Sequence, residues 1–414
     1  MTDHAPRIPA MDVLRGCAVM GILWMNVTAF AFPEAAYSNP VAAGPLSTGD
    51  ILFWATGFIL FDGKMRGLFS LLFGASMLLL IDREEMAGRD GRRSHQVRMG
   101  WLFAFGLTHY LLLWAGDILM TYAVVGVAAL AFVRLEPLAL VKRAFLAFAA
   151  HFLLCAIFVA SLYIWAHSAS APDASSATKA AFMHFIAGMT DPASPAALAE
   201  TAIYRGEFAG VVLHHLSGFP GQWLWTLMFS ALDSLGFMLL GMAMLKAGFL
   251  TGRWDAAQYW RTARHCFLIG LPPMAALAVW TIISGFAPLT TIGIVLAWSF
   301  PLRIPLTVGW AALILWLIAR HRGSPLVTRL AATGRLALSN YLGTSLALAA
   351  LFYGWCLGWF GTVRLAQLPL IIAAGWTTML IWSPMWQRNF AMGPVEWLWR
   401  SLAAGQTQKI RKNR

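Results

Sequence analysis

The chain has 414 residues, of which 59% are apolar and only 12% are charged, and its mean hydropathy is +0.66. Soluble domains carry about 25% charged residues, so this composition excludes an ordinary soluble protein and predicts an all-α, polytopic transmembrane bundle. The formal net charge is +12. Because the basic residues lie in short segments between apolar runs, this charge indicates membrane orientation and not nucleic-acid binding.

The apolar runs predict about ten membrane spans. They cover residues 13–32, 63–81, 100–114, 118–133, 144–166, 222–248, 265–284, 304–320, 336–353 and 367–385. Residues 286–303 are also apolar, and an eleventh span, a re-entrant hairpin and an interfacial helix stay open for them. Basic residues fall on alternate loops, which predicts cytoplasmic termini and a bacterial inner-membrane protein.

The same pattern divides the chain into four parts. We expect an N-terminal transmembrane region over 1–166 and an extracytoplasmic loop over 167–208, partly helical from residue 195. A C-terminal transmembrane region should cover 209–400 and a basic cytoplasmic tail 401–414. The expected partners are the lipid bilayer and small molecules, and a homodimer is left open.

A line of polar residues marks the first apolar run. Asp12 and Arg15 stand at its start, and Asn26 lies eleven residues after Arg15. Eleven helical steps come to about 1100°, about 20° beyond three turns, so Arg15 and Asn26 share one helix face. Their separation is about 16 Å, which places Asn26 deep in the apolar region, where polar groups usually face a protein interior or a cavity.

His109 and Asp117 are the first candidates for chemistry. They lie at the predicted outer end of the third span, on either side of a turn at Gly116. A neutral imidazole is the commonest general base, and a carboxylate partner fixes its tautomer. The alternative is a packed histidine, with Asp117 as the N-cap of the next helix.

Three further charged residues are candidates for substrate binding. Lys64 and Arg66 open the second span, where they could hold an anionic substrate or anchor the helix at the interface. Asp233 interrupts the sixth span, and an acid at that depth usually accompanies function. Its structural alternative is a pair with Arg303 or with a hydroxyl group.

Arginines of the inner loops form a candidate anion site. If the fold brings them together, Arg92, Arg93, Arg98 and Arg335 would suit a phosphorylated cofactor such as coenzyme A, through bidentate contacts. The positive-inside rule explains the same residues without a ligand. The cysteines lack metal-type spacing, and no metal is expected.

Several segments together resemble the bacterial YeiB-type membrane proteins over nearly the whole chain. The motifs are Arg7…Asp12-x-x-Arg15-Gly16…Asn26, Gly63-Lys64…Gly74, Gly106…His109…Gly116-Asp117, Gly334-Arg335-Leu-Ala-Leu-Ser-Asn-Tyr341 and Gly393-Pro-Val-Glu-Trp397. The N-terminal motif is also similar to that of transmembrane acyltransferases, the group of the heparan glucosaminide acetyltransferases and the surface-polysaccharide O-acetyltransferases. That resemblance implies transfer of an acyl group from cytoplasmic acyl-CoA to an acceptor outside.

The resemblance also assigns roles to residues. The O-acetyltransferase branch has a catalytic histidine at the position of Asn26, and the glucosaminide branch has an asparagine there. An amide cannot act as a base but can position a carbonyl or donate to an oxyanion, so His109, with Asp117, is expected to replace the base. The expected donor is acyl-CoA, and acetyl-CoA in particular. It would be held by Asp12, Arg15, Arg92, Arg93, Arg98 and Arg335, and the glycan or lipid acceptor would be held by Lys64, Arg66 and Asp233.

The alternative function is a proton-coupled transporter of a small or lipid-like solute. In that reading Asp233 and His109 would be proton-relay groups.

Overall fold

The computed structural model describes residues 8–321 and 323–412, so Arg7 of the N-terminal motif lies outside the described residues. Over this part of the chain the structure is helical, and an isolated antiparallel bridge joins Phe390 and Arg411. The longer helices are α1 (Pro9–Ala31), α4 (Lys64–Met86), α5 (Gly91–Leu112), α6 (Leu119–Ala129), α7 (Pro137–Ser170), α11 (Gly221–Lys246), α12 (Ala256–Ile283), α14 (Phe300–Arg320), α16 (Ala337–Phe352) and α17 (Leu368–Asn389). The shorter helices are α2 (Ala35–Ser38), α3 (Thr48–Thr56), α8 (Ser176–Thr190), α9 (Pro195–Tyr204), α10 (Phe208–Gly218), α13 (Pro288–Gly293), α15 (Pro325–Arg335) and α18 (Pro394–Ala404).

Each of the expected spans coincides with one of the longer helices. Among the described residues, seven helical segments are long and apolar enough to cross a membrane, and Leu119–Phe132 and Ala337–Phe352 are shorter apolar helices. Helix α5 also covers its expected span, although its first turns carry basic residues. The prediction of an all-α membrane bundle is confirmed.

The apolar segment 286–303 is not a full eleventh span. It forms a short helical segment, Pro288–Trp298, before α14 begins at Phe300. A helix of this length covers about 16 Å, roughly half of a hydrocarbon core of about 30 Å. Of the three interpretations left open, the full span is therefore wrong.

Helix α3 was not expected from the apolar runs. Ser47 accepts a hydrogen bond from the Asp50 backbone and Asp50 bonds back to Ser47, a reciprocal capping box that starts the helix. Asp50 also receives the Ala366 amide at 2.8 Å and Arg364 at 3.2 Å. The Ser-x-x-Asp signature before an apolar run was the signal that would have predicted it.

Residues 167–208 are more helical than expected. Helix α7 continues to Ser170, and α8 and α9 follow it. Ser175 and Ser194 cap the two helices by accepting hydrogen bonds from backbone amides three residues later. Serine caps therefore organise a segment whose small, polar composition predicted mainly loop.

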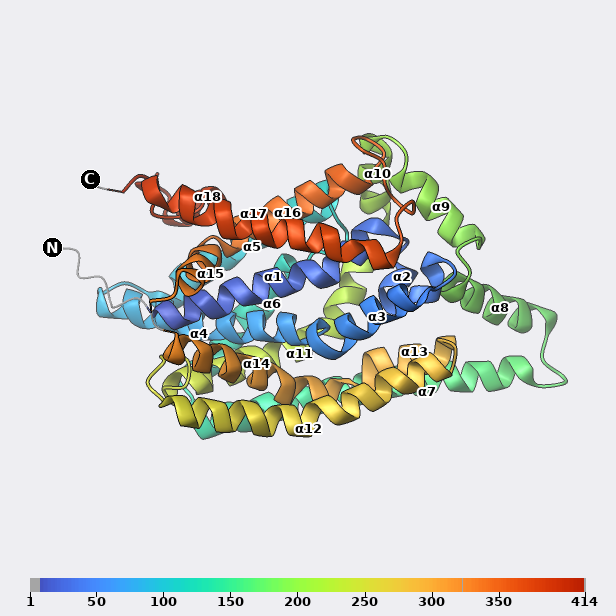
Figure 1. Cartoon of the computed structure of the whole chain (residues 1–414), viewed down its shortest axis with the longest axis horizontal. Helices are drawn as coiled ribbons and strands as arrows, with labels where there is room; N and C mark the ends of the chain where they lie inside the picture. The colour runs from blue at the N-terminus through green and yellow to red at the C-terminus, as the bar shows by residue number, and fades with distance from the viewer. Residues whose placement is uncertain (1–7, 322, 413–414) are drawn as a thin grey trace.

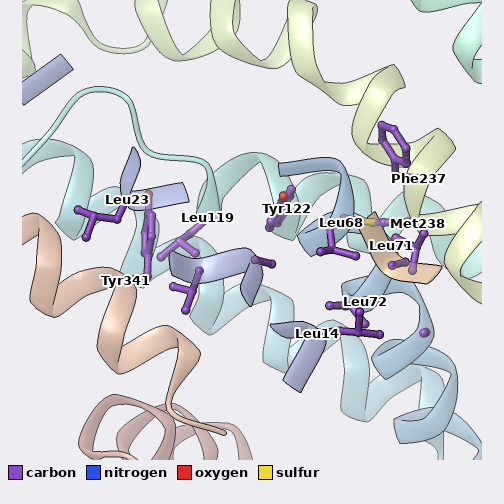
Figure 2. Close-up of a cluster of buried hydrophobic side chains, with 14 of the residues drawn as sticks. Leu14, Leu23, Leu68, Leu71, Leu72, Leu119, Tyr122, Phe237, Met238 and Tyr341 are labelled. Carbon is purple, nitrogen blue, oxygen red and sulfur yellow. The ribbon is translucent and has the colours of Figure 1, made fainter. Parts of the chain in front are cut away.

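The helices run along the long axis of the molecule, with α1 in its centre (Figure 1). Helix α1 contacts α4, α14, α15, α16 and α17. We call the end where α1 begins and α18 lies the inner end, and the end that carries α8 and α9 the outer end. Leu14, Leu68, Leu119 and Phe237 are among the fully or nearly fully buried side chains that join α1, α4, α6 and α11 in the core (Figure 2).

Candidate functional site at the inner end

Two glycines bring α1 and α15 into backbone contact. A Cβ at Gly334 would lie 1.8 Å from the Asp12 carbonyl oxygen, and one at Gly16 would lie 2.2 Å from that of Leu330. Only glycine permits such an approach without displacing backbone. Since each glycine is adjacent to an arginine, the crossing brings Arg15 and Arg335 to the same region of the bundle.

An inner cavity of about 270 Å³ opens at this crossing. Four arginines line it, from α1, α5, α15 and α18: Arg15, Arg98, Arg335 and Arg400. The rest of the lining includes apolar side chains such as Phe69, Met99 and Leu119, together with His95, Tyr122 and Glu396. The sequence segments that supply the arginines are remote from one another, so the fold assembles a basic site that no single loop contains.

Neighbouring side chains orient these arginines. Arg15 pairs with Asp12 at 3.1 Å and donates to the Ser76 hydroxyl at 2.9 Å. The Arg335 guanidinium donates to the side-chain oxygen of Gln387 on α17. Bonds of this kind hold a guanidinium in one direction, which lowers the entropy lost when it binds an anion.

The other arginines of the candidate anion site, and Asn26 of the first span, lie away from this cavity. Arg92 donates to the Leu130 carbonyl at 3.2 Å, and Arg93 is exposed on the outside of α5. Neither lines the inner cavity. Asn26 is half-buried in the outer half of α1. The fold thus brings Arg15, Arg98 and Arg335 together and leaves Arg92, Arg93 and Asn26 apart from them.

His109 and Asp117 form a buried pair between α5 and α6. His109 Nδ1 lies 2.8 Å from Asp117 Oδ2, and the two residues are 3% and 1% exposed. The other carboxylate oxygen, Oδ1, accepts the Met120 amide at 3.0 Å, so Asp117 orients the histidine and caps α6 at once. Asp117 therefore both contacts the His109 ring and caps the next helix.

Gly106 makes this pair possible. A Cβ at that position would lie 2.6 Å from the Met120 backbone nitrogen and 2.7 Å from Asp117 Oδ1. The missing side chain lets the start of α6 approach α5 closely enough for the carboxylate to reach His109.

The pair has the arrangement of a general base. Because the carboxylate accepts a hydrogen bond, the proton of the neutral imidazole resides on Nδ1, and Nε2 carries the basic lone pair. Nε2 is buried and has no hydrogen-bond partner among the described residues. A buried polar atom of this kind calls for an explanation, and a substrate contact is one.

The charged residues at the outer end of α4 form internal pairs. Arg66 makes an ion pair with Asp233 on α11, and Arg303 pairs with Asp62 at 2.8 Å. Lys64 is completely buried and donates to the Phe58 carbonyl. We call these five residues the buried charge cluster. A structural pair with Arg303 or with a hydroxyl group was one of the alternatives for Asp233. The structure gives it an ion pair, but with Arg66, because Arg303 reaches Asp62.

A second glycine crossing explains this pairing. A Cβ at Gly74 would lie 2.1 Å from the Met238 carbonyl oxygen, and one at Gly241 would lie 1.9 Å from that of Leu71. Arg66 and Asp233 each precede their glycine by eight residues, so they meet about 12 Å along the two helices from the crossing.

A polar network lies near the outer end of the bundle, where α5 ends. Tyr110 donates to the side chain of Gln222 at 3.2 Å, and Gln222 donates to Glu34 at 3.1 Å. The Glu34 amide in turn donates to Glu200 at 2.9 Å. Burial, with a smaller contribution from the nearby Glu34 carboxylate, raises the pKa of Glu200 to about 7, although the Glu34 amide opposes this shift.

Sequence reasoning missed several residues of the inner cavity. Glu396 on α18 accepts the Leu338 amide at 2.8 Å and the Ser339 amide at 3.0 Å. These bonds cap α16 from another helix, which no local pattern predicts. His95 was also missed. It bonds the Gly126 carbonyl at 3.1 Å, and its sequence neighbourhood gave no signal for this contact.

Comparisons with known proteins give relatives along nearly the whole chain. It is 31% identical over 407 residues to the uncharacterised protein YeiB of Escherichia coli (strain K12), covering 95% of each chain. It is 27% identical over 420 residues to the uncharacterised protein YxaH of Bacillus subtilis (strain 168), covering 98% of this chain and 96% of that one. No solved structure matches the chain. Residues 244–406 match the family model described as a protein of unknown function, DUF418. The full-length similarity to YeiB, at this identity, shows that the chain belongs to the YeiB family of membrane proteins.

Proposed function

We propose that this protein is an integral-membrane acyltransferase that moves an acyl group from cytoplasmic acyl-CoA to an acceptor at the opposite side or within the membrane. The observation that carries the proposal is the inner cavity, whose lining combines arginines from four helices with apolar side chains. Guanidinium groups are the preferred partners of phosphates. The alternation of basic segments supports a cytoplasmic location for this end, and the proposal takes the membrane to be the inner membrane of a bacterium.

The cavity fits part of such a donor. Its volume of about 270 Å³ lies just below the range for small-molecule sites, about 300–1,000 Å³, so it holds part of the donor and not the whole. The pantetheine arm and the acyl group would occupy the apolar part, and the phosphates would remain with the arginines. Arg400 is exposed and Arg15, Arg98 and Arg335 are partly exposed, as groups that meet a ligand from solvent must be.

His109 supplies the proton transfer in this proposal. Nε2 takes the proton from a hydroxyl or amine of the acceptor, and the acceptor atom forms a bond to the acyl carbon. The carbon–sulfur bond then breaks, and the departing thiolate receives the proton from the imidazolium. Asp117 stabilises the positive charge that forms on His109 during the step.

The transporter alternative has less support. It relies on Asp233 as a proton carrier, and Arg66 holds that carboxylate in an ion pair. This pair joins α4 to α11, and Arg303 and Asp62 form a second ion pair in the same cluster. The charge cluster is better explained as a structural one.

Binding of acetyl-CoA to the purified full-length protein tests the proposal. Arg98→Ala should weaken the affinity about ten- to a hundredfold, since one charge-assisted contact is worth about 1.5–3 kcal/mol. Arg93→Ala is the matched control, because Arg93 lies on the same helix, is exposed and does not line the cavity. Absence of binding at millimolar acetyl-CoA, or equal loss in both variants, would contradict the proposal.

The chemistry has its own test. Inside-out membrane vesicles supplied with radiolabelled acetyl-CoA should transfer label to an extractable lipid or glycan, and His109→Ala should abolish that transfer. Normal transfer by this variant would remove His109 from the mechanism.

A further inference from the structure

Tyr341 lies against the buried pair and has no assigned role. Its ring centroid is 5.3 Å from that of His109, at an interplanar angle of 49°. The residue is 6% exposed and its hydroxyl is buried. The Ile118 backbone approaches the hydroxyl oxygen, and no group among the described residues accepts the hydroxyl proton. The Tyr341 hydroxyl, with a proton to donate, and His109 Nε2, without a partner, therefore belong to side chains in contact.

The helices that bear these atoms also form the cavity wall. On α16, Ala337 and Leu338 line the inner cavity, and Tyr341 follows them by one turn on the same face, about 5–6 Å deeper. On α5, Leu102 lines the cavity, and His109 follows it by two turns, about 10 Å deeper. Figure 2 shows Tyr341 in the same part of the core as Leu119, which lines the cavity from α6. The cavity thus points toward the pair.

An unpartnered hydroxyl at this position is costly unless something uses it. Leaving a buried donor without a partner costs about 1–3 kcal/mol, and a phenylalanine would pack in the same space without that cost. A ligand that brings an oxygen acceptor to the end of the cavity would supply the missing bond. In the proposed reaction the acyl carbonyl is the group that must pass from the cavity, which neither His109 nor Tyr341 lines, to these two side chains.

We propose that Tyr341 donates a hydrogen bond to the carbonyl oxygen of the bound thioester and stabilises the negative charge that forms on it. The inference rests on the proposed acyl transfer. As the acceptor atom bonds to the acyl carbon, the carbonyl π electrons move to oxygen, which accepts the Tyr341 O–H. When the carbon–sulfur bond breaks, the electrons return to the carbonyl and Tyr341 keeps its proton. Preorganised donors of this kind are among the largest contributions to acyl transfer.

The test compares Tyr341, near the start of α16, with Tyr353, which follows the end of the same helix. Tyr341→Phe removes the hydroxyl and keeps the ring on His109. Tyr353→Phe is the matched control, because Tyr353 is also buried with an unpartnered hydroxyl but contacts Phe30, Tyr204 and Phe360. The assay is release of coenzyme A from acetyl-CoA, with water as the acceptor, by the full-length protein in detergent.

Tyr341→Phe should lower kcat about a hundredfold, the usual effect of losing one such donor, with KM for acetyl-CoA unchanged within about threefold. Tyr353→Phe should leave both parameters unchanged. If Tyr341→Phe keeps full activity while His109→Ala is inactive, the role of Tyr341 is wrong and the acyltransferase proposal stands. If the unaltered protein neither binds nor cleaves acetyl-CoA, both proposals are overturned.

A second variant guards against loss of folding. Replacing Tyr341 by 3-fluorotyrosine keeps the ring and the hydroxyl and makes the hydroxyl more acidic, which strengthens its hydrogen bond to an oxyanion. A change in kcat with an unchanged melting temperature supports the proposal. An unchanged kcat overturns it.

Discussion

Helices α1 and α15 cross at Gly16 and Gly334, and helices α4 and α11 cross at Gly74 and Gly241, yet the arginines near the two crossings meet different surroundings. Arg15 and Arg335 line an open cavity, whereas Arg66 is bound to Asp233 and its region holds a second ion pair. The same packing device therefore serves two purposes. Arg15 and Arg66 each have a carboxylate partner and a similar exposed fraction of the side chain, 25% and 27%. They differ in their other neighbours: Arg15 shares a cavity with three further arginines, whereas the region of Arg66 holds a second ion pair.

Tyr122 connects the two regions. It lines the inner cavity, and its hydroxyl lies 2.9 Å from that of Ser70 and donates to the Arg66 carbonyl at 3.3 Å. The charge cluster therefore supports one wall of the cavity, and the comparison can be tested by substitutions in each region.

Removing one charge of the cluster should have the largest effect on stability. Asp233→Ala leaves Arg66 without its partner, and breaking a buried ion pair costs about 3–5 kcal/mol. We expect a large fall in the melting temperature of the detergent-solubilised protein. The double variant Arg66→Met with Asp233→Leu should recover most of the loss, because it removes both charges. Wild-type stability for Asp233→Ala would show that the pair is not structural.

Disrupting the close contact between α1 and α15 beside the cavity should have the next largest effect. Gly334→Ala places a Cβ 1.8 Å from the Asp12 carbonyl oxygen, so α1 and α15 must separate, at a cost of about 1–3 kcal/mol. Acetyl-CoA binding should weaken with it, because Arg15 and Arg335 move apart. Gly343→Ala is the control, since a Cβ there has nothing within 4 Å. Unchanged binding and melting temperature in Gly334→Ala would mean that the crossing does not position the arginines.

Loss of the cap on α16 should have the smallest effect. Glu396→Ala removes the acceptor of the Leu338 and Ser339 amides, and the loss of a helix cap costs about 1 kcal/mol. Glu207→Ala is the control, because Glu207 stands at the start of α10 without a side-chain cap bond. A melting temperature that falls equally in both variants would argue against capping by Glu396.

The pairing of His109 with Asp117 shows what could be predicted locally. The two residues are eight positions apart, so a turn between consecutive helices is enough to bring them together, and sequence reasoning predicted their contact. The partner of Asp233 was not predictable in this way. Arg66 and Arg303 are both remote in sequence, and the choice between them follows from where α4 and α11 cross.

The sequence by itself determined the class of the protein, its expected spans and the local polar motifs, because apolar runs and turn signals act over one helix at a time. Only the tertiary structure decided that Arg15, Arg98 and Arg335 share a cavity while Arg92 and Arg93 lie outside it. All five residues are arginines at or near the ends of apolar segments, so their sequence positions do not distinguish them. The glycine contact between α1 and α15 brings Arg15 and Arg335 together, and the packing of α5 determines that its Arg98 face, and not the face of Arg92 and Arg93, meets the cavity. These contacts exist only when the bundle is folded.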